Sequence, residues 1–197
     1  MPTQPPCRLL GLSGSIRRQS HCTAVLQTLA ERLSGKAALT LFPLNDIPPY
    51  DPDLDSAGTP PAAVAMRDAI AGSDGLVVIS PEYNHGMSGV LKNALDWASR
   101  PAMRSPVRDK PTLIMTVSPA FTGGVRAQHA MRETLSAMLG RVIARPQVAI
   151  AAVHEKIRDG RLADPAALTF ALAAVDDLIA EIRLLRRAQD TAPPPPA

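Results

Sequence analysis

A loop rich in hydroxyl groups follows the first apolar run of the chain, at residues 13–20. It carries Ser13, Ser15 and Ser20 together with Arg17. Small residues between a strand and a helix let backbone N–H groups approach an anion, which the helix dipole also favours. Arg17 adds a fork of charged donors. The loop matches neither the dinucleotide nor the Walker glycine pattern. Two interpretations stay open: a phosphate-monoester site, or a capping loop with Ser20 as N-cap and Arg17 in solvent.

A second polar loop, over residues 80–97, follows the third apolar run. It reads Ser-Pro-Glu-Tyr-Asn-His-Gly-Met-Ser-Gly-Val-Leu-Lys-Asn-Ala-Leu-Asp-Trp. Tyr83 and Asn84 offer a ring edge and amide donors to a flat, polar ligand. His85 fits an exposed loop histidine better than a ligand contact. Trp97 fits packing or a subunit contact better than stacking on a cofactor.

The third loop, residues 118–128, follows the fourth apolar run. Gly123 and Gly124 can bring the backbone close to a ligand, and Arg126 and Gln128 fall in the first turn of the next helix. A glycine turn at the start of a helix is common in proteins without any function. This loop therefore indicates a ligand site only in combination with the other two loops.

Strands that alternate with helices are expected to position these loops. Short apolar runs alternate with helical patterns along the whole chain, which indicates parallel βαβ units with right-handed crossovers. The expected fold is an α/β, doubly wound, five-stranded parallel sheet with helices on both faces, and ligands bind such sheets beyond the carboxyl ends of strands. Gly140 is expected just past the end of the fourth helix. The expected strands are 7–12, 37–41, 75–80, 112–117 and one within 142–153, and the expected helices are 20–33, 61–71, 90–98, 124–139 and 165–187.

Length and composition fit one globular domain. The chain has 197 residues, of which 46% are hydrophobic and 20% charged, with a net charge of +3. We expect one domain over residues 7–188, with tails at 1–6 and at the proline-rich 189–197. So small a net charge gives no reason to expect nucleic acid or a membrane as partner, and no apolar run is long enough to span a bilayer.

The numbers and spacing of cysteine and histidine bear on the cellular compartment and on metal binding. Two cysteines and no apparent signal peptide fit a reducing cytoplasm and exclude a disulfide scaffold. The four histidines show no metal-ligand spacing, so no metal site is expected.

Taken together, the three loops resemble the NADPH-dependent FMN reductase family, whose fold is flavodoxin-like. The resemblance covers roughly residues 7–155 and rests on the motifs at 14–20, 81–97 and 123–128. It implies that FMN and NADPH are the cofactors. By position, the resemblance assigns the FMN phosphate to Ser15, Arg17 and Ser20, the ring and ribityl chain to Pro81, Glu82, Tyr83 and Asn84, and the other ring edge to Ser118, Gly123 and Gly124. His21 and Cys22, which follow Ser20, are also expected to bind the cofactor.

Two positions depart from the family pattern. Cys22 stands where members usually carry asparagine. We expect a small buried residue there, with a low-pKa thiol at the helix terminus as the alternative. Phe121 lies in a loop that is often richer in glycine, and we expect it to narrow the ring site.

The resemblance implies an enzyme that moves a hydride from NADPH to the flavin and passes the electrons to FMN, a quinone, an azo dye or a metal oxyanion. The cofactor performs this chemistry, so no catalytic side chain is expected. A flavin-binding electron carrier and a degenerate, non-enzymatic member are the alternatives. The mildly basic charge, and the lack of an aromatic pair flanking the ring site, favour the enzyme. Members commonly form homodimers or homotetramers, and the segment 43–61, with Tyr50, is a candidate rim or interface loop.

Overall fold

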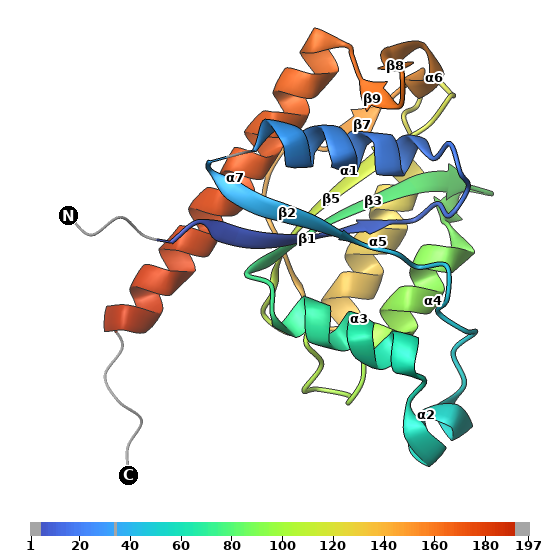
Figure 1. The fold of residues 1–197 in the computed structure, drawn as a ribbon, viewed down its shortest axis with the longest axis vertical. Coiled ribbons are helices and arrows are strands. Elements are labelled where there is room, and N and C mark those ends of the chain that lie inside the picture. The colour runs from blue at the N-terminus through green and yellow to red at the C-terminus, as the bar shows by residue number, and fades with distance from the viewer. Residues whose placement is uncertain (1–4, 34, 192–197) are drawn as a thin grey trace.

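The computed structural model describes residues 5–33 and 35–191. It is an α/β fold around one mostly parallel sheet (Figure 1). The strands are β1 (Cys7–Ser13), β2 (Ala37–Phe42), β3 (Gly75–Tyr83), β4 (Gly86–Met87), β5 (Pro111–Val117), β6 (Arg141–Val142), β7 (Val148–Ile150), β8 (Ile157–Arg158) and β9 (Arg161–Leu162). The helices are α1 (His21–Arg32), α2 (Pro52–Gly58), α3 (Pro61–Ala71), α4 (Gly89–Ala98), α5 (Val125–Ala137), α6 (Val153–Lys156) and α7 (Pro165–Thr191).

The strand order confirms the doubly wound sheet. The order is β2-β1-β3-β5-β6, and every pair along this path is parallel. The chain reverses its direction of winding between β1 and β3, which is the switch point where such folds bind ligands. The loops after β1, β3 and β5 therefore meet at one edge of the sheet.

The fifth position of the sheet differs from the single expected strand. It is filled by two short strands: β6 pairs with the start of β5, and β7 pairs with its end. Pro146 lies between them and cannot donate a ladder hydrogen bond, which explains the break. The sheet also gains β4, which folds back antiparallel on β3.

Two apolar cores lie on the two faces of the sheet. Alternate residues of the central strand face opposite sides: Val77 and Ile79 pack with α1 and α7, whereas Leu76 and Val78 pack with α3, α4 and α5. Because both faces of this strand are buried, residues 75–80 form a nearly continuous apolar run without alternating polar residues. The helices confirm the expectation that both faces are covered.

The segment between β2 and α3 holds a short helix, α2, where a rim or interface loop is expected from the sequence. Asp51 caps it and Pro52 opens it, a start signal already present in the sequence. The segment is fixed to α4 because Asn93 Nδ2 and Trp97 Nε1 both donate to the carbonyl oxygen of Pro48, each at 2.8 Å. Trp97 is fully buried and meets Tyr50 edge to face, which confirms it as a packing residue.

The end of α5 corrects one expectation. The left-handed residue is Leu139, with φ of 60°, and not Gly140. The N–H of Leu139 bonds to Ser136 and that of Gly140 to Leu135, which is the Schellman pattern one residue earlier than expected. Gly140 is needed for space instead, since a Cβ there would lie 3.1 Å from the Leu135 carbonyl oxygen and 3.1 Å from Val107.

Helix α7 begins as expected and extends further than expected. Asp164 Oδ1 accepts from the N–H of Ala167 at 2.8 Å, and Pro165 is the first helical residue. The helix continues to Thr191 rather than ending near residue 187. The proline run of the expected C-terminal tail, like residues 1–4, lies outside the described residues. Within residues 5–33 and 35–191, no helix is long and apolar enough to cross a membrane.

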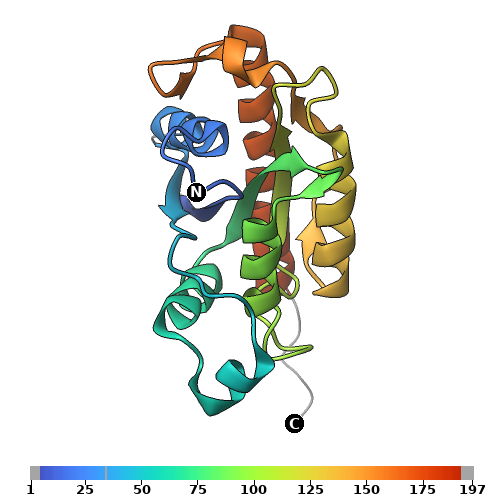
Figure 2. The same cartoon turned by 90° about the vertical axis from the view of Figure 1, so that its right-hand side faces the viewer.

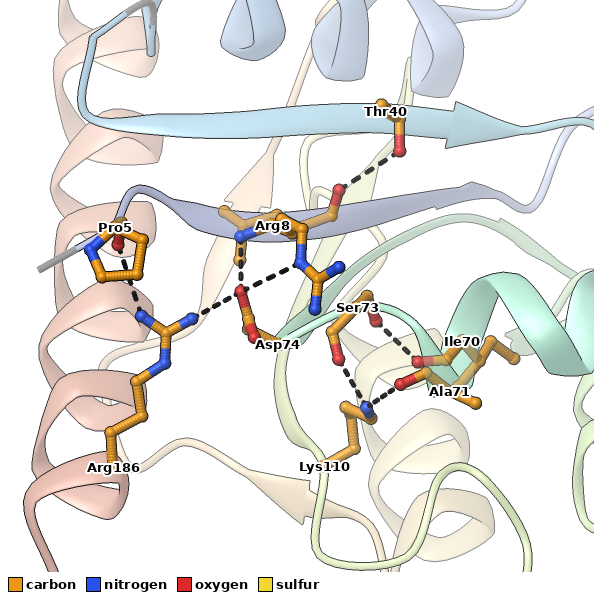
Figure 3. A network of polar contacts seen from close by, with 10 residues as sticks. Pro5, Arg8, Thr40, Ile70, Ala71, Ser73, Asp74, Lys110 and Arg186 are labelled. Carbon is orange, nitrogen blue, oxygen red and sulfur yellow. Dashed lines mark hydrogen bonds and ion pairs between the residues drawn. The ribbon is translucent and has the colours of Figure 1, made fainter. Parts of the chain in front are cut away.

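A network of hydrogen bonds and ion pairs lies at the amino ends of the central strands, opposite the three loops. Figure 3 shows its residues. Asp74 Oδ2 accepts from the backbone N–H of Arg8 at 2.6 Å and pairs with the Arg186 guanidinium at 2.7 Å. Lys110 Nζ donates to the carbonyl oxygen of Ser73 at 2.6 Å. These contacts join β1, β3, β5 and α7, so they support the framework that holds the loops.

Candidate functional site

A cavity of about 220 Å³ opens where the loops after β1, β3 and β5 converge. The start of α6 closes it on one side. Its walls combine cationic and hydroxyl groups at the α1 end with apolar groups and one tyrosine at the other. The lining residues are Ser15, Arg17, His21, Cys22, Pro81, Tyr83, Val117, Pro119 and Val153.

The first loop is held tightly against the sheet. The N–H of Gly14 donates to the carbonyl oxygen of Ile79 at 2.7 Å, and a Cβ on Gly14 would meet Ser80 and Ser88 at 3.0–3.1 Å. Any larger residue would need Ser80 or Ser88 to shift by a few tenths of an ångström. The path of the loop after β1 is therefore set by the Gly14 hydrogen bond and by the small space beside Ser80 and Ser88.

The capping interpretation and the anion interpretation of this loop are compatible. Ser20 Oγ accepts from the N–H of Thr23 at 3.2 Å, so Ser20 is the N-cap of α1. Arg17 is exposed and also lines the cavity. Within the described chain, the backbone N–H groups of residues 16–19 donate to no protein acceptor. These donors and the guanidinium are free to meet an anion at the helix terminus.

His21 and Cys22, the first residues of α1, are both kept uncharged at neutral pH. Burial lowers the pKa of His21, and the nearby charges of Arg17 and His154 lower it further. Burial raises the pKa of the Cys22 thiol to about 12. The expectation of a small buried residue at position 22 is confirmed, and the low-pKa alternative is wrong because loss of hydration outweighs the charge of Arg17 and the hydrogen bonds to the thiol.

The second loop is a tight hairpin between β3 and β4 that stands at one end of α4 (Figure 2). Asn84 and His85 form its turn, with φ of 49° and 67°. Both positive values belong to the type of turn that matches the twist of a hairpin. The hairpin places Tyr83, which is 53% exposed, on the rim of the cavity. His85 is exposed, as expected.

Glu82 joins the second loop to the third. Its Oε2 accepts from the N–H of Arg126 at 3.0 Å, and its Oε1 lies 3.6 Å from the Arg126 guanidinium. The helix α5 has Gly124 as its N-cap and no capping side chain of its own. Glu82 supplies that missing acceptor from another loop, and its negative charge suits the helix N-terminus.

The third loop is shaped by backbone contacts with β7. Gly123 and Gly124 have φ of 65° and 85°, and a Cβ on Gly123 would meet Ala149 at 2.9–3.1 Å. Ser118 is buried, donates its N–H to Ile150 at 3.0 Å and accepts from Ala120 at 3.1 Å. These residues fix the loop and leave little of themselves to face the cavity.

The structure brings about half of the predicted site residues to the cavity. Those that line it are Ser15, Arg17, His21, Cys22, Pro81 and Tyr83. The others do not line it, and their contacts and backbone angles shape the loops: Ser20, Glu82, Asn84, Ser118, Gly123 and Gly124. Sequence reasoning missed Val117, Pro119 and Val153. Val153 follows the last parallel strand, whose carboxyl end lies at the same edge, and this topological signal was available.

Phe121 corrects another expectation. Its side chain is 91% exposed and does not line the cavity, so it does not narrow the ring site within this chain. The neighbouring glycines turn the loop back to β7 and leave Phe121 at its tip. Pro119, two residues earlier in the same loop, lines the cavity instead.

The residues present fit FMN. The α1 end of the cavity offers unpartnered N–H groups and a guanidinium to a phosphate monoester, and the other end is lined by Pro81, Tyr83 and Pro119. No cluster of three or more metal-binding side chains occurs among the described residues. An anion donor set beside an apolar wall at the switch point is the arrangement expected of a flavodoxin-like, flavin-binding protein.

Comparison with known proteins gives the family. The sequence model of the NADPH-dependent FMN reductase family matches residues 7–155, and the chain belongs to that family. It is 36% identical over 180 residues to an NAD(P)H-dependent FMN reductase of Pseudomonas aeruginosa, covering 91% of this chain and 97% of that protein. It is 32% identical over 184 residues to a quinone reductase of Escherichia coli, covering 90% and 97%.

A solved structure supports the same assignment. The flavoenzyme NAD(P)H:(acceptor) oxidoreductase FerB from Paracoccus denitrificans superimposes with a TM-score of 0.78 at 27% identity. The alignment covers 90% of this chain and 97% of FerB. The flavodoxin-like fold expected from the sequence is confirmed.

Proposed function

We propose that this chain is an FMN-dependent NAD(P)H oxidoreductase that reduces a small-molecule acceptor, with a quinone or a free flavin as the class its relatives favour. The observation that carries the proposal is the cavity itself. It joins a loop with free N–H donors and Arg17 to a slot walled by Pro81, Tyr83 and Pro119. When bound there, FMN supplies the redox chemistry, taking up a hydride and passing the electrons on.

The protein's own residues bind and orient. Arg17 and the N–H groups of residues 16–19 hold the phosphate. Pro81, Tyr83 and Pro119 bound the ring, and Glu82 keeps the second and third loops at a fixed separation through Arg126. Cys22 contributes a buried thiol to the wall of the cavity, and burial raises the pKa of that thiol to about 12.

The assembly and location are part of the proposal. A homodimer or homotetramer fits the exposed apolar side chains of Ile16, Tyr83 and Phe121, one in each of the three loops. A partner subunit there would cover apolar surface and complete the acceptor pocket. A cytoplasmic location fits Cys7 and Cys22, which are both free and buried.

An anaerobic titration tests the function. The purified protein, loaded with FMN, is expected to show flavin absorbance near ~450 nm that NADPH bleaches and that a quinone restores. A protein that binds FMN but resists NADPH would be a carrier, and one that ignores FMN would be a degenerate member. Either result would overturn the proposal.

A further inference from the structure

A second cavity, of about 370 Å³, lies at the carboxyl ends of α4 and α5. Both helices begin at the second and third loops, so this cavity is at the far end of each helix from the flavin cavity. The two cavities share no lining residue. The loop between α4 and β5 supplies the remaining wall.

Backbone contacts hold this loop wall in place. The N–H of Asp109 donates to the carbonyl oxygen of Leu139, just past the end of α5, at 2.8 Å. Arg108 Nη1 donates to the carbonyl oxygen of Met103 at 2.8 Å. Val107, in the same loop, is fully buried. The cavity is therefore preformed in the folded chain.

Arg100, two residues past the end of α4, lines this cavity with a guanidinium that lacks a polar partner. Within residues 5–33 and 35–191, its side chain makes no hydrogen bond and no ion pair, and its Nε is buried. The guanidinium lies over the Tyr50 ring, 5.5 Å from the ring centroid. This stacking uses the flat face of the group, whereas its donors point outward from the edge. Buried donors are nearly always hydrogen-bonded, so the unspent donors of Arg100 need an explanation.

Arg67 shows how a guanidinium is satisfied in the same part of the fold. It also lies over an aromatic ring, that of Trp97, and its three nitrogens donate to the Trp97 carbonyl oxygen, to Thr59 and to Asp55. Asp55 is close enough to Arg100 to feel its charge, but the hydrogen bonds to Asp55 come from Thr59 and Arg67. The acceptors of this region are therefore committed to Arg67.

The other groups of the cavity suit an anion with an apolar body. Lys92 and Asp96 form an ion pair, with Nζ 2.6 Å from Oδ1, so Arg100 leaves the wall with one net positive charge. The apolar lining includes Met103 and Met138, and methionine side chains adapt to ligands of different shape.

The geometry points to a binding site for a small monocarboxylate with an apolar body, in which Arg100 pairs with the carboxylate while Met103 and Met138 contact the apolar part. A guanidinium and a carboxylate match through two parallel hydrogen bonds. A single net positive charge suits a monoanion better than a phosphate dianion. The volume falls within the roughly 300–1,000 Å³ of small-molecule sites. The site lies outside the flavin cavity, so this inference does not depend on the proposed function.

Calorimetric titration of the FMN-saturated protein with 2-naphthoate tests the assignment. FMN fills the flavin cavity, and the neutral isostere 2-naphthamide presents the same apolar body without the charge. The acid is expected to bind, and the amide to bind about tenfold more weakly or less, because a charged hydrogen-bond pair is lost. Arg100→Met keeps a long apolar side chain and is expected to weaken acid binding about tenfold or more. Arg104→Met is the matched control and should bind the acid as wild type does, since Arg104 is exposed in the same loop and does not line the cavity.

A second variant tests the cavity and leaves the guanidinium in place. Ala137 is exposed in the last turn of α5 and lines the cavity, so a larger side chain there does not disturb the core. Ala137→Phe is expected to fill the apolar part of the cavity and to abolish acid binding. Circular dichroism shows that each variant is folded. If the chain does not take up FMN, the flavin absorbance shows this before any acid is added, and the same titrations are run on the FMN-free protein.

Three results would overturn the assignment. The first is the absence of any binding heat for 2-naphthoate at millimolar concentrations. The second is equal binding of the acid and the amide, which would indicate an apolar contact alone. The third is unchanged acid binding in Arg100→Met or in Ala137→Phe, which would place the acid elsewhere on the protein.

Discussion

Glu82 is predicted to stabilise the protein as a capping residue supplied from outside the helix it caps. Its carboxylate, 10% exposed, accepts the Arg126 N–H at 3.0 Å, and the charged partner at 3.6 Å is 55% exposed. Loss of a helix cap costs about 1 kcal/mol, and an ion pair with so exposed a partner adds at most about 1 kcal/mol. Glu82→Ala should therefore lower the free energy of unfolding by about 1–2 kcal/mol. Glu82→Gln keeps an oxygen acceptor and should lose only about 0.5 kcal/mol.

Urea denaturation of the FMN-free protein measures these differences. The slope of the unfolding free energy against urea concentration should be unchanged, which shows that only the stability differs. Glu133→Ala is the matched control, since Glu133 is exposed on the same helix and makes no ion pair within the described residues. If Glu82→Ala is as stable as wild type, or if the glutamine variant is as unstable as the alanine variant, the capping role is refuted.

Three further predictions follow from contacts around the same framework. Cys22, whose pKa is raised to about 12, should resist iodoacetamide at pH 8 in the native protein and react only after unfolding, so rapid native labelling would contradict its burial. Burial alone would raise the pKa of Asp74, but its hydrogen bonds from Arg8 and Arg186 lower it overall below the usual 3.8. The extra stability of wild type over Asp74→Asn should be fully present above that pH and shrink as the pH falls below it, whereas a constant difference in acid titrations followed by circular dichroism would refute the pairing. Gly123→Ala should lower the free energy of unfolding by about 1–3 kcal/mol, because φ is positive and the new Cβ would strike β7, and a thermal midpoint equal to wild type would contradict this.

The sequence was sufficient for features that depend on local pattern. The apolar run at 75–80 and the loops that follow β1, β3 and β5 could be read because periodicity, glycine and proline are local signals. Arg17 and Ser20 followed from their place between a strand and a helix. These predictions also located the edge of the sheet where the cavity opens.

Features that depend on distant contacts could not be read. Glu82 meets Arg126 across 44 residues of sequence, and nothing local distinguishes it from a loop glutamate that contacts a ligand. The Asn84–His85 turn has two positive φ values without glycine, so the usual hairpin signal is missing. A bulky residue in a loop that the family often fills with glycine predicts that Phe121 narrows the ring site, whereas the path of the loop leaves Phe121 in solvent.

The most direct test of the account is the affinity of Arg17→Ala for FMN compared with riboflavin, which lacks the phosphate. If Arg17 holds the phosphate, the dissociation constant for FMN should rise about tenfold to a hundredfold, as expected for a charged hydrogen-bond donor. Riboflavin binding should then be nearly unchanged, and Arg32→Ala should leave both ligands unaffected. Equal weakening for both flavins, or none for FMN, would contradict the placement of the phosphate at the start of α1.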